Sequence, residues 1–155
     1  MAQQEEDLDL LRLRRILAAV DTRIAEALTG AGLTVDQWRL LALLVTQGPR
    51  SMAHLAAQMA VPAATLTRTA DRLCTSALAY RAVDPADRRR VVLHAAERGA
   101  KLHAAIAPAV RDAEMAGLRA ADAEDVSGTI RVFELLSAGV QPEATLRGAS
   151  GRGAP

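Results

Sequence analysis

The sequence predicts a mainly α-helical fold that contains one small β-hairpin. Half of the 155 residues are hydrophobic and only 2% are aromatic, so alanine and leucine, both good helix formers, must fill much of the core. Apolar residues recur at spacings of three and four along most of the chain, which is typical of amphipathic helices. Two short apolar runs, 79–83 and 91–93, interrupt this spacing and flank a polar turn, as in a hairpin. The length and hydrophobic content exclude a largely disordered protein and predict one ordinary domain.

The first part of the chain predicts a long helix and then a shorter one. Apolar residues from Leu8 to Leu28 form one stripe, which ends near Gly30 and Gly32. Thr34 is expected to be the N-cap of the second helix, which stops at Gly48 and the following proline. The inward face of this second helix is expected to carry Trp38, Leu41, Ala42 and Val45.

Two more helices are predicted before the hairpin. Ser51 is expected to cap a short helix from Met52 to Met59. The next helix runs from Val61 to Leu73, and Pro62 fits its first turn because the missing N–H would be unpaired there anyway. Its inner face is expected to consist of Leu66, Ala70 and Leu73. Its outer side is left with four polar residues, Thr65, Thr67, Arg68 and Arg72.

Two helices are predicted after the hairpin. A long helix begins at Glu97, and Pro108 within it is expected to produce a kink, since proline removes a backbone hydrogen bond. The last helix runs from about Ala123 to Val140. The remaining segment, 141–155, is rich in glycine, alanine, serine and proline and is expected to be a flexible tail.

The order of these elements predicts a winged helix-turn-helix that is flanked by dimerisation helices. In residues 33–96, two helices joined by a tight turn are followed by a two-stranded wing. The helices in residues 1–32 and 97–140 carry apolar stripes that a monomer does not easily cover. We therefore expect these two segments to associate with a second copy of the chain.

The distribution of charge favours a nucleic-acid partner, although the formal net charge is only +1. Between Val61 and Lys101 there are eight cationic side chains and four anionic ones. A local basic patch of this kind, rather than the total charge, determines the affinity for phosphates. All but one of these cations are arginines, which make forked contacts with phosphates and base edges.

Several classes of protein and site are not expected. Cys74 is the only cysteine, so no intrachain disulfide is possible, and it is more often a buried small hydrophobic residue than a redox sensor. The three histidines lack a metal-ligand spacing, and no set of catalytic residues or phosphate-binding glycine loop is present, so we expect neither a cofactor nor an enzyme. Without a signal sequence or a long apolar run, the expected location is cytoplasmic, away from the membrane.

Three segments stand in a characteristic order and spacing: Leu33 to Leu41, Ala64 to Leu73, and Asp84 to Arg90 with the later Gly99. In these segments the chain resembles the MarR family of bacterial winged helix-turn-helix transcription regulators, and the resemblance runs from about residue 8 to residue 140. It implies a homodimer in which the fourth helix enters a major groove and the wing reaches an adjacent minor groove. It also implies release of DNA by a small aromatic or phenolic ligand that binds between the dimerisation and DNA-binding parts.

The chain departs from the family's usual pattern at two helix starts. Ala95 and Ala96 stand where members often have Leu-Thr, so the helix after the wing loses its N-cap. His54 stands where members often have glutamate, which would complete a capping box with Ser51. Each change should weaken local capping by about 1 kcal/mol.

The wing turn is expected to hold DNA through Arg88, Arg89 and Arg90. A narrow minor groove attracts inserted arginine, and the resemblance favours Arg89 for that role, with Arg88 or Arg90 on phosphate. Asp87 is expected to brace the wing through an ion pair with a nearby arginine. The alternative is that the three arginines are a solvated charge run.

On the fourth helix, Arg68 is expected to read guanine edges or to hold phosphate, and Thr65 and Thr67 to contact phosphate or a thymine methyl group. Arg72 is a further DNA contact, or the partner of Asp71 in an ion pair that supports the wing. Ser51 is expected to cap its helix and to lie near a phosphate. The alternative for the threonines and Arg68 is an ordinary polar helix face.

The function expected is that of a homodimeric, sequence-specific DNA-binding regulator, a repressor that a small molecule releases from a pseudo-palindromic operator on double-stranded DNA. The candidate ligand-binding residues are Arg15 and Trp38, although Trp38 is more often a core residue and Arg15 can simply face water. The alternative function is a winged-helix module that binds an acidic protein surface and no DNA.

Overall fold

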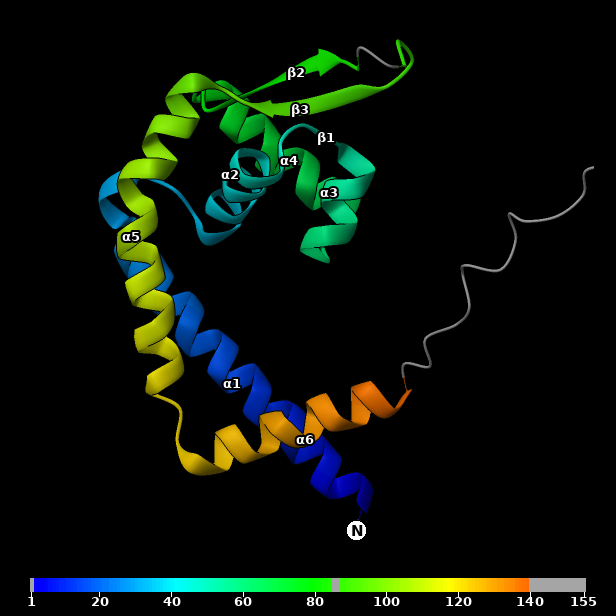
Figure 1. The fold of residues 1–155 in the computed structure, drawn as a ribbon, viewed down its shortest axis with the longest axis vertical. Coiled ribbons are helices and arrows are strands. Elements are labelled where there is room, and N and C mark those ends of the chain that lie inside the picture. Colours follow the sequence, from blue (N-terminus) through cyan, green and yellow to red (C-terminus); the bar gives the residue numbers. More distant parts are fainter. Residues whose placement is uncertain (1, 85–86, 140–155) are drawn as a thin grey trace, which may run out of the picture. The chain divides into compact units, whose positions relative to one another are not determined.

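The protein is mainly helical with a small antiparallel sheet, as the sequence predicts. The structure, a computed structural model, describes residues 2–84 and 87–139. Within this part of the chain, no helix combines the length and apolar character needed to cross a membrane. The predicted tail, 141–155, and the predicted last helical residue, Val140, lie outside the described residues. In chain order the elements are α1 (Ala2–Leu28), η1 (Thr29–Ala31), α2 (Val35–Gln47), β1 (Arg50–Ser51), α3 (Met52–Met59), α4 (Ala63–Thr75), β2 (Ala79–Val83), β3 (Val91–Ala95), α5 (Glu97–Arg119) and α6 (Ala123–Gly139) (Figure 1).

The chain forms two compact units. The central unit comprises residues 18–120 and contains α2 to α5, the sheet and the second part of α1. The terminal unit is built from the chain before Ala18 and the chain after Ala120, so it contains the first part of α1 and α6. The helix α1 therefore contributes to both units.

The sheet of the central unit has three strands rather than the two of the predicted hairpin. Strands β2 and β3 pair antiparallel, and Val83 lies opposite Val91 at the end next to the turn. The two-residue strand β1 pairs with the other edge of β3, which gives the order β1-β3-β2. The sequence could not predict β1, because two residues are too few to show an alternating pattern.

The main core of the central unit lies where α2, α3 and α4 meet the sheet. It is made of fully buried leucines from each of these elements, namely Leu40, Leu41, Leu55, Leu66, Leu73 and Leu93. The predicted inner face of α4 is confirmed, since Leu66, Ala70 and Leu73 are buried. The predicted face of α2 was incomplete, because Leu40 and Leu44 are buried whereas Ala42 and Val45 are half-buried. This helix packs against α4, α5 and β3 and so buries more than one side.

The helix starts follow the predicted caps, with one shift. The Thr34 hydroxyl accepts a hydrogen bond from the backbone N–H of Gln37, whose side chain in turn accepts from the Thr34 N–H, so the N-terminus of α2 has a full capping box. The Ser51 hydroxyl accepts from the N–H of His54 at the start of α3. Pro62 is the N-cap of α4 rather than a residue of its first turn, and α4 ends at Thr75, beyond the predicted Leu73.

Replacing Ala96 with serine should stabilise the protein by about 1 kcal/mol. Ala96 precedes α5 in the extended conformation of an N-cap (φ −77°, ψ 159°) but makes no side-chain capping bond, as its sequence predicts. A serine hydroxyl at this position can accept from an N–H of the first turn of α5. The free energy of unfolding in urea measures the gain. The Ala100→Ser variant, inside the same helix, is the control and should not be stabilised.

In the terminal unit, charged side chains make part of the contact between α1 and α6, and Ile16 of α1 and Val132 of α6 are buried as well. The carboxylate of Asp9, a buried residue of α1, accepts hydrogen bonds of 2.6 and 2.8 Å from Arg131 of α6 and one of 3.0 Å from Arg12. The Arg131 hydrogen bond, followed by that of Arg12, lowers the pKa of Asp9 to about 2. The stabilising effect of this depressed pKa is fully present above the ordinary value of 3.8 and is lost progressively as the pH falls from there through about 2.

Candidate nucleic-acid interface

The outer side of α4 carries the polar side chains that the sequence placed there. Thr67 and Arg68 are exposed, and Thr65 is half-buried. The Thr67 hydroxyl donates to the carbonyl oxygen of Ala63, one turn earlier, at 2.9 Å. Because this bond uses the hydroxyl proton, the methyl group of Thr67 and its oxygen lone pairs remain for a partner. A thymine methyl therefore suits Thr67 better than a phosphate, which needs a donor.

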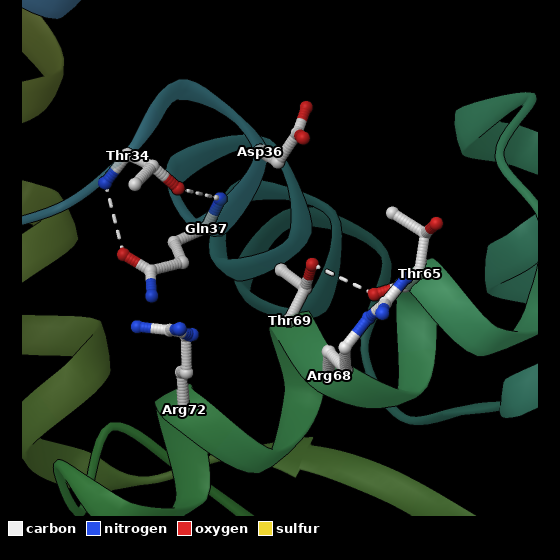
Figure 2. Close-up of a pocket in the computed structure, with 7 residues that line it drawn as sticks. All are labelled: Thr34, Asp36, Gln37, Thr65, Arg68, Thr69 and Arg72. Carbon is white, nitrogen blue, oxygen red and sulfur yellow. Dashed lines mark hydrogen bonds between the residues drawn. The ribbon is translucent and has the colours of Figure 1, made fainter.

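A polar pocket of about 350 Å³ lies between the start of α2 and one flank of α4. Four α4 residues at helical spacing, Thr65, Arg68, Thr69 and Arg72, face the N-cap Thr34 and Asp36 and Gln37 of α2 across it (Figure 2). Figure 2 shows the guanidinium of Arg72 extending toward the side chain of Gln37. Sequence reasoning missed Thr69, which is buried and whose hydroxyl is satisfied by donating to the carbonyl of Thr65 at 3.0 Å.

The ion pair that links α4 to the wing is not the predicted one. Asp71 was expected to pair with Arg72, but it pairs with Arg81 of β2, with 2.7 Å between Oδ1 and Nη2. Consecutive residues of a helix point in directions about 100° apart, so Asp71 and Arg72 do not face each other. Arg81 was not among the predicted site residues, since the pairing of a helix with a strand leaves no local pattern. The ion pair joins α4 directly to the first strand of the wing.

The wing turn is closed by backbone hydrogen bonds. The Asp84 N–H donates to the Arg90 carbonyl at 2.8 Å, and the Arg90 N–H donates to the Asp87 carbonyl at 2.9 Å. The Asp87 carboxylate was predicted to form an ion pair with an arginine, but the described contact is a 3.0 Å hydrogen bond from the backbone N–H of Arg89. Aspartate often folds back on the backbone two residues later in this way in turns. Asp87 therefore stabilises the conformation of the turn.

The three wing arginines are exposed, and so are two valines beside them. Arg88, Arg89 and Arg90 all lie on the surface at the turn. Val83 and Val91, the last cross-strand pair before the turn, have exposed fractions of 55% and 49%. Sequence reasoning assigned no role to this pair, although its position next to the arginines was visible. The wing thus presents cationic side chains on an apolar base.

The remaining predicted residues lie elsewhere. Ser51 belongs to β1 and is half-buried opposite Val92 of β3, with its oxygen accepting the N–H of His54. Its hydroxyl proton is not used in that bond and can be donated to a phosphate. Arg15 belongs to the terminal unit, where its guanidinium lies 3.5 Å from the carboxylate of Asp125.

Trp38 lies in a second core cluster of the central unit. It is only 6% exposed, packs with Ile24, Leu28 and Val110, and stacks on the ring of His103 at a centroid distance of 4.8 Å. Burial lowers the pKa of His103 below its ordinary value. This environment is that of a core residue, and a ligand-binding role for Trp38 or Arg15 stays a prediction.

No metal site accompanies this surface in the described part of the chain, where no group of three or more histidine, cysteine, aspartate or glutamate side chains is arranged to hold an ion. Cys74, near the end of α4, is half-buried against the main core. The chemistry available at α4 and the wing is therefore that of hydrogen bonding and positive charge.

Comparison with known proteins identifies relatives of this chain. Residues 31–90, from η1 to the wing turn, match the family model described as the MarR family. A segment of 79 residues is 38% identical to the HTH-type transcriptional repressor NicR of Pseudomonas putida, and the match covers 51% of this chain and 50% of that protein. The match thus spans half the length of this curated relative.

Two solved structures are similar over most of the chain. The first, from work on the regulation of DNA binding of Bordetella bronchiseptica BpsR by 6-hydroxynicotinic acid, has a TM-score of 0.67 at 22% identity and covers 81% of this chain and 89% of that one. The second, a cysteine-to-serine mutant of E. coli MarR with operator DNA, has a TM-score of 0.66 at 21% identity with the same coverage. At these identities the similarity establishes the fold, a winged helix-turn-helix with flanking helices.

Proposed function

We propose that this chain, which belongs to the MarR family, is a transcription regulator that binds double-stranded DNA through α4 and the wing. The observation that carries the proposal is the joining of the two elements. The exposed Thr67 and Arg68 of α4 and the exposed arginines of the wing belong to parts tied together by the Asp71–Arg81 ion pair. A helix fixed to a cationic hairpin suits a duplex, which offers a major groove beside a narrower minor groove.

Each polar residue has a proposed role in this interface. Arg68 reads guanine edges or holds phosphate, and Thr67 meets a thymine methyl group. Arg89 enters the minor groove, which attracts inserted arginine. The Asp87 carboxylate accepts its backbone N–H and so fixes its place in the turn. Arg88 and Arg90 contact phosphates on either side. Arg72, Thr65 and Ser51 contact the DNA backbone.

The chain divides by function into four segments. Residues 33–96 bind DNA, residues 1–32 and 97–140 form the dimer, and residues 141–155 are a tail.

We propose that the regulator works as a homodimer. Leu10, Leu11 and Leu17 on α1 are between 51% and 55% exposed, and Val126 and Ile130 on α6 are 43% and 53% exposed. Apolar side chains of this number on two helices favour association with a second copy. A twofold dimer would place two copies of α4 about one DNA turn, ~34 Å, apart on a pseudo-palindromic operator.

We propose further that the protein is a repressor that a small aromatic acid releases. The relative NicR is named a repressor, and the BpsR structure concerns regulation of DNA binding by 6-hydroxynicotinic acid. A ligand that binds better to a form with the wrong spacing between the two recognition helices lowers the operator affinity. The buried Trp38, the only tryptophan, offers a fluorescence signal for a titration with a panel of aromatic acids. A panel without any effect on fluorescence or on operator affinity would contradict this ligand class.

The DNA-binding proposal is tested by fluorescence anisotropy at physiological salt. A labelled duplex from the region upstream of the gene is compared with a random duplex of equal length. We expect the upstream duplex to bind about 1000-fold more tightly, as specific sites typically do. Equal affinity for both duplexes would contradict sequence-specific regulation. The absence of any duplex binding would favour a protein-binding module with an acidic partner.

A further inference from the structure

The terminal unit contains a buried carboxylate that two arginines share. The side chain of Asp9 is only 3% exposed, and its oxygens lie 2.6 Å from Nε of Arg131 and 3.0 Å from Nη1 of Arg12. Asp9 and Arg131 are 122 residues apart in the sequence, so the contact fixes α6 on α1. The three hydrogen bonds that Asp9 accepts, two from Arg131 and one from Arg12, are charge-assisted, which makes them stronger than neutral ones.

Gly128 of α6 lies next to this carboxylate, where a side chain would not fit. A Cβ atom built on Gly128 would lie 2.8 Å from Oδ1 of Asp9 and 2.8 Å from Cδ of Arg12. The α6 backbone therefore approaches the charged group more closely than a residue with a side chain would allow. The close approach and the hydrogen bonds act at the same point of α6.

The same face of α1 continues with further charged contacts. Arg12 also donates to Glu124 at 3.3 Å, and Arg15 lies 3.5 Å from Asp125, which is 8% exposed. Asp9, Arg12 and Arg15 are spaced three residues apart and so follow one side of the helix. Within the terminal unit, α1 thus turns a charged side toward α6.

The leucines of α1 are left outside this contact. Leu10, Leu11 and Leu17 are each more than half exposed and line a shallow apolar pocket of about 460 Å³ with Leu13 and Arg14. In most helical pairs the apolar side is the one that is buried. Here charged contacts help to join the two helices of one chain, and Leu10, Leu11 and Leu17 of α1 remain exposed for another partner.

We propose that Asp9 is a positioning residue for self-association: its carboxylate holds α6 in place on α1, and with it the exposed Val126 and Ile130 of α6, which a second copy covers. The proposal rests on the homodimer of the proposed function. Asp9 touches neither DNA nor ligand in this role and acts through the placement of α6. Removing the charge leaves Arg12 and Arg131 facing each other without their shared anion, which releases α6.

The test compares the Asp9→Asn variant with the wild type in two measurements. In hydrogen–deuterium exchange, we expect α6 and the first part of α1 to exchange about tenfold faster or more, while α2 to α4 change little, because the buried anion that two arginines share is removed in the terminal unit alone. In sedimentation equilibrium, we expect the dimer dissociation constant to rise by about tenfold or more. Glu124→Gln is the matched control, because Glu124 is 82% exposed and contacts the same Arg12.

A double-mutant cycle with Arg131→Gln tests whether Asp9 acts through Arg131. If Asp9 acts through Arg131, the double variant should be about as impaired as either single variant. Additive effects in the cycle, or unchanged exchange in Asp9→Asn, would overturn the proposal. A wild type that sediments as a monomer would instead contradict the homodimer, while the exchange data would still report on the hold of Asp9 on α6.

Discussion

Replacing Arg88, Arg89 and Arg90 together with alanine should weaken operator binding at least about 100-fold at physiological salt. The three arginines are exposed at the wing turn, where the proposed function assigns one to the minor groove and two to phosphates. Each phosphate that the protein no longer neutralises reduces the slope of log K against log salt by about 0.9, so a dimer with four fewer such phosphates should have a slope shallower by about 3 to 4. Anisotropy titrations at several salt concentrations measure both quantities.

The Arg23→Ala variant is the control for this loss of positive charge. Arg23 is exposed on α1 in the central unit, lies 4.0 Å from Glu26, and is not among the predicted DNA contacts. It should change neither the affinity nor the slope by much. A triple wing variant that folds as the wild type does and keeps both its affinity and its salt slope would refute a DNA-binding wing.

Replacing Gly99 with alanine should destabilise the central unit by about 3 kcal/mol. A Cβ atom at this position would lie 2.1 Å from the backbone carbonyl oxygen of Leu78 and 3.0 Å from Cδ1 of Leu41. The carbonyl is held in place because it accepts the N–H of Ala96 at 3.0 Å, so backbone must move rather than a flexible side chain. The first turn of α5 would be pushed off the end of α4 and the sheet.

Urea unfolding measures this loss, with Gly30→Ala as the matched control. A Cβ atom on Gly30 meets no atom within 4 Å, and its backbone is not in the left-handed region. The control should therefore leave the free energy of unfolding within about 0.5 kcal/mol. If Gly99→Ala were as stable as Gly30→Ala, the described packing of α5 on Leu78 would be incorrect.

Local signals in the sequence were sufficient to predict most of the elements. Thr34 and Ser51 were assigned as N-caps from residue type and position alone, and both make the expected hydrogen bonds. The hairpin strands follow from two apolar runs on either side of a polar turn, and they end where predicted, at Val83 and Val91. In each case the determining interactions join residues close in the sequence.

The contacts that the sequence did not predict join residues far apart in the chain. The pairing of β1 with β3 connects Arg50 with Leu93, and the hold of α6 on α1 connects Asp9 with Arg131. For Asp71, the sequence suggested Arg72 as the partner, and the approach of β2 to α4 instead brings Arg81 to it. Ion pairs of this kind leave no periodic pattern in the sequence, so they can be identified only from the tertiary structure.

The most direct test of the central claim, that α4 and the wing hold DNA, is to map where the wing touches the operator. In a Cys74→Ala background, the Arg89→Cys variant can carry an iron chelate that cleaves nearby DNA. We expect cleavage of both strands at two positions placed symmetrically about the operator centre, each in a minor groove next to a half-site. A chelate attached through Arg111→Cys on α5, as a control, should cleave weakly or not at all. Equal cleavage from both positions, or none from position 89 on bound operator, would contradict DNA binding by the wing.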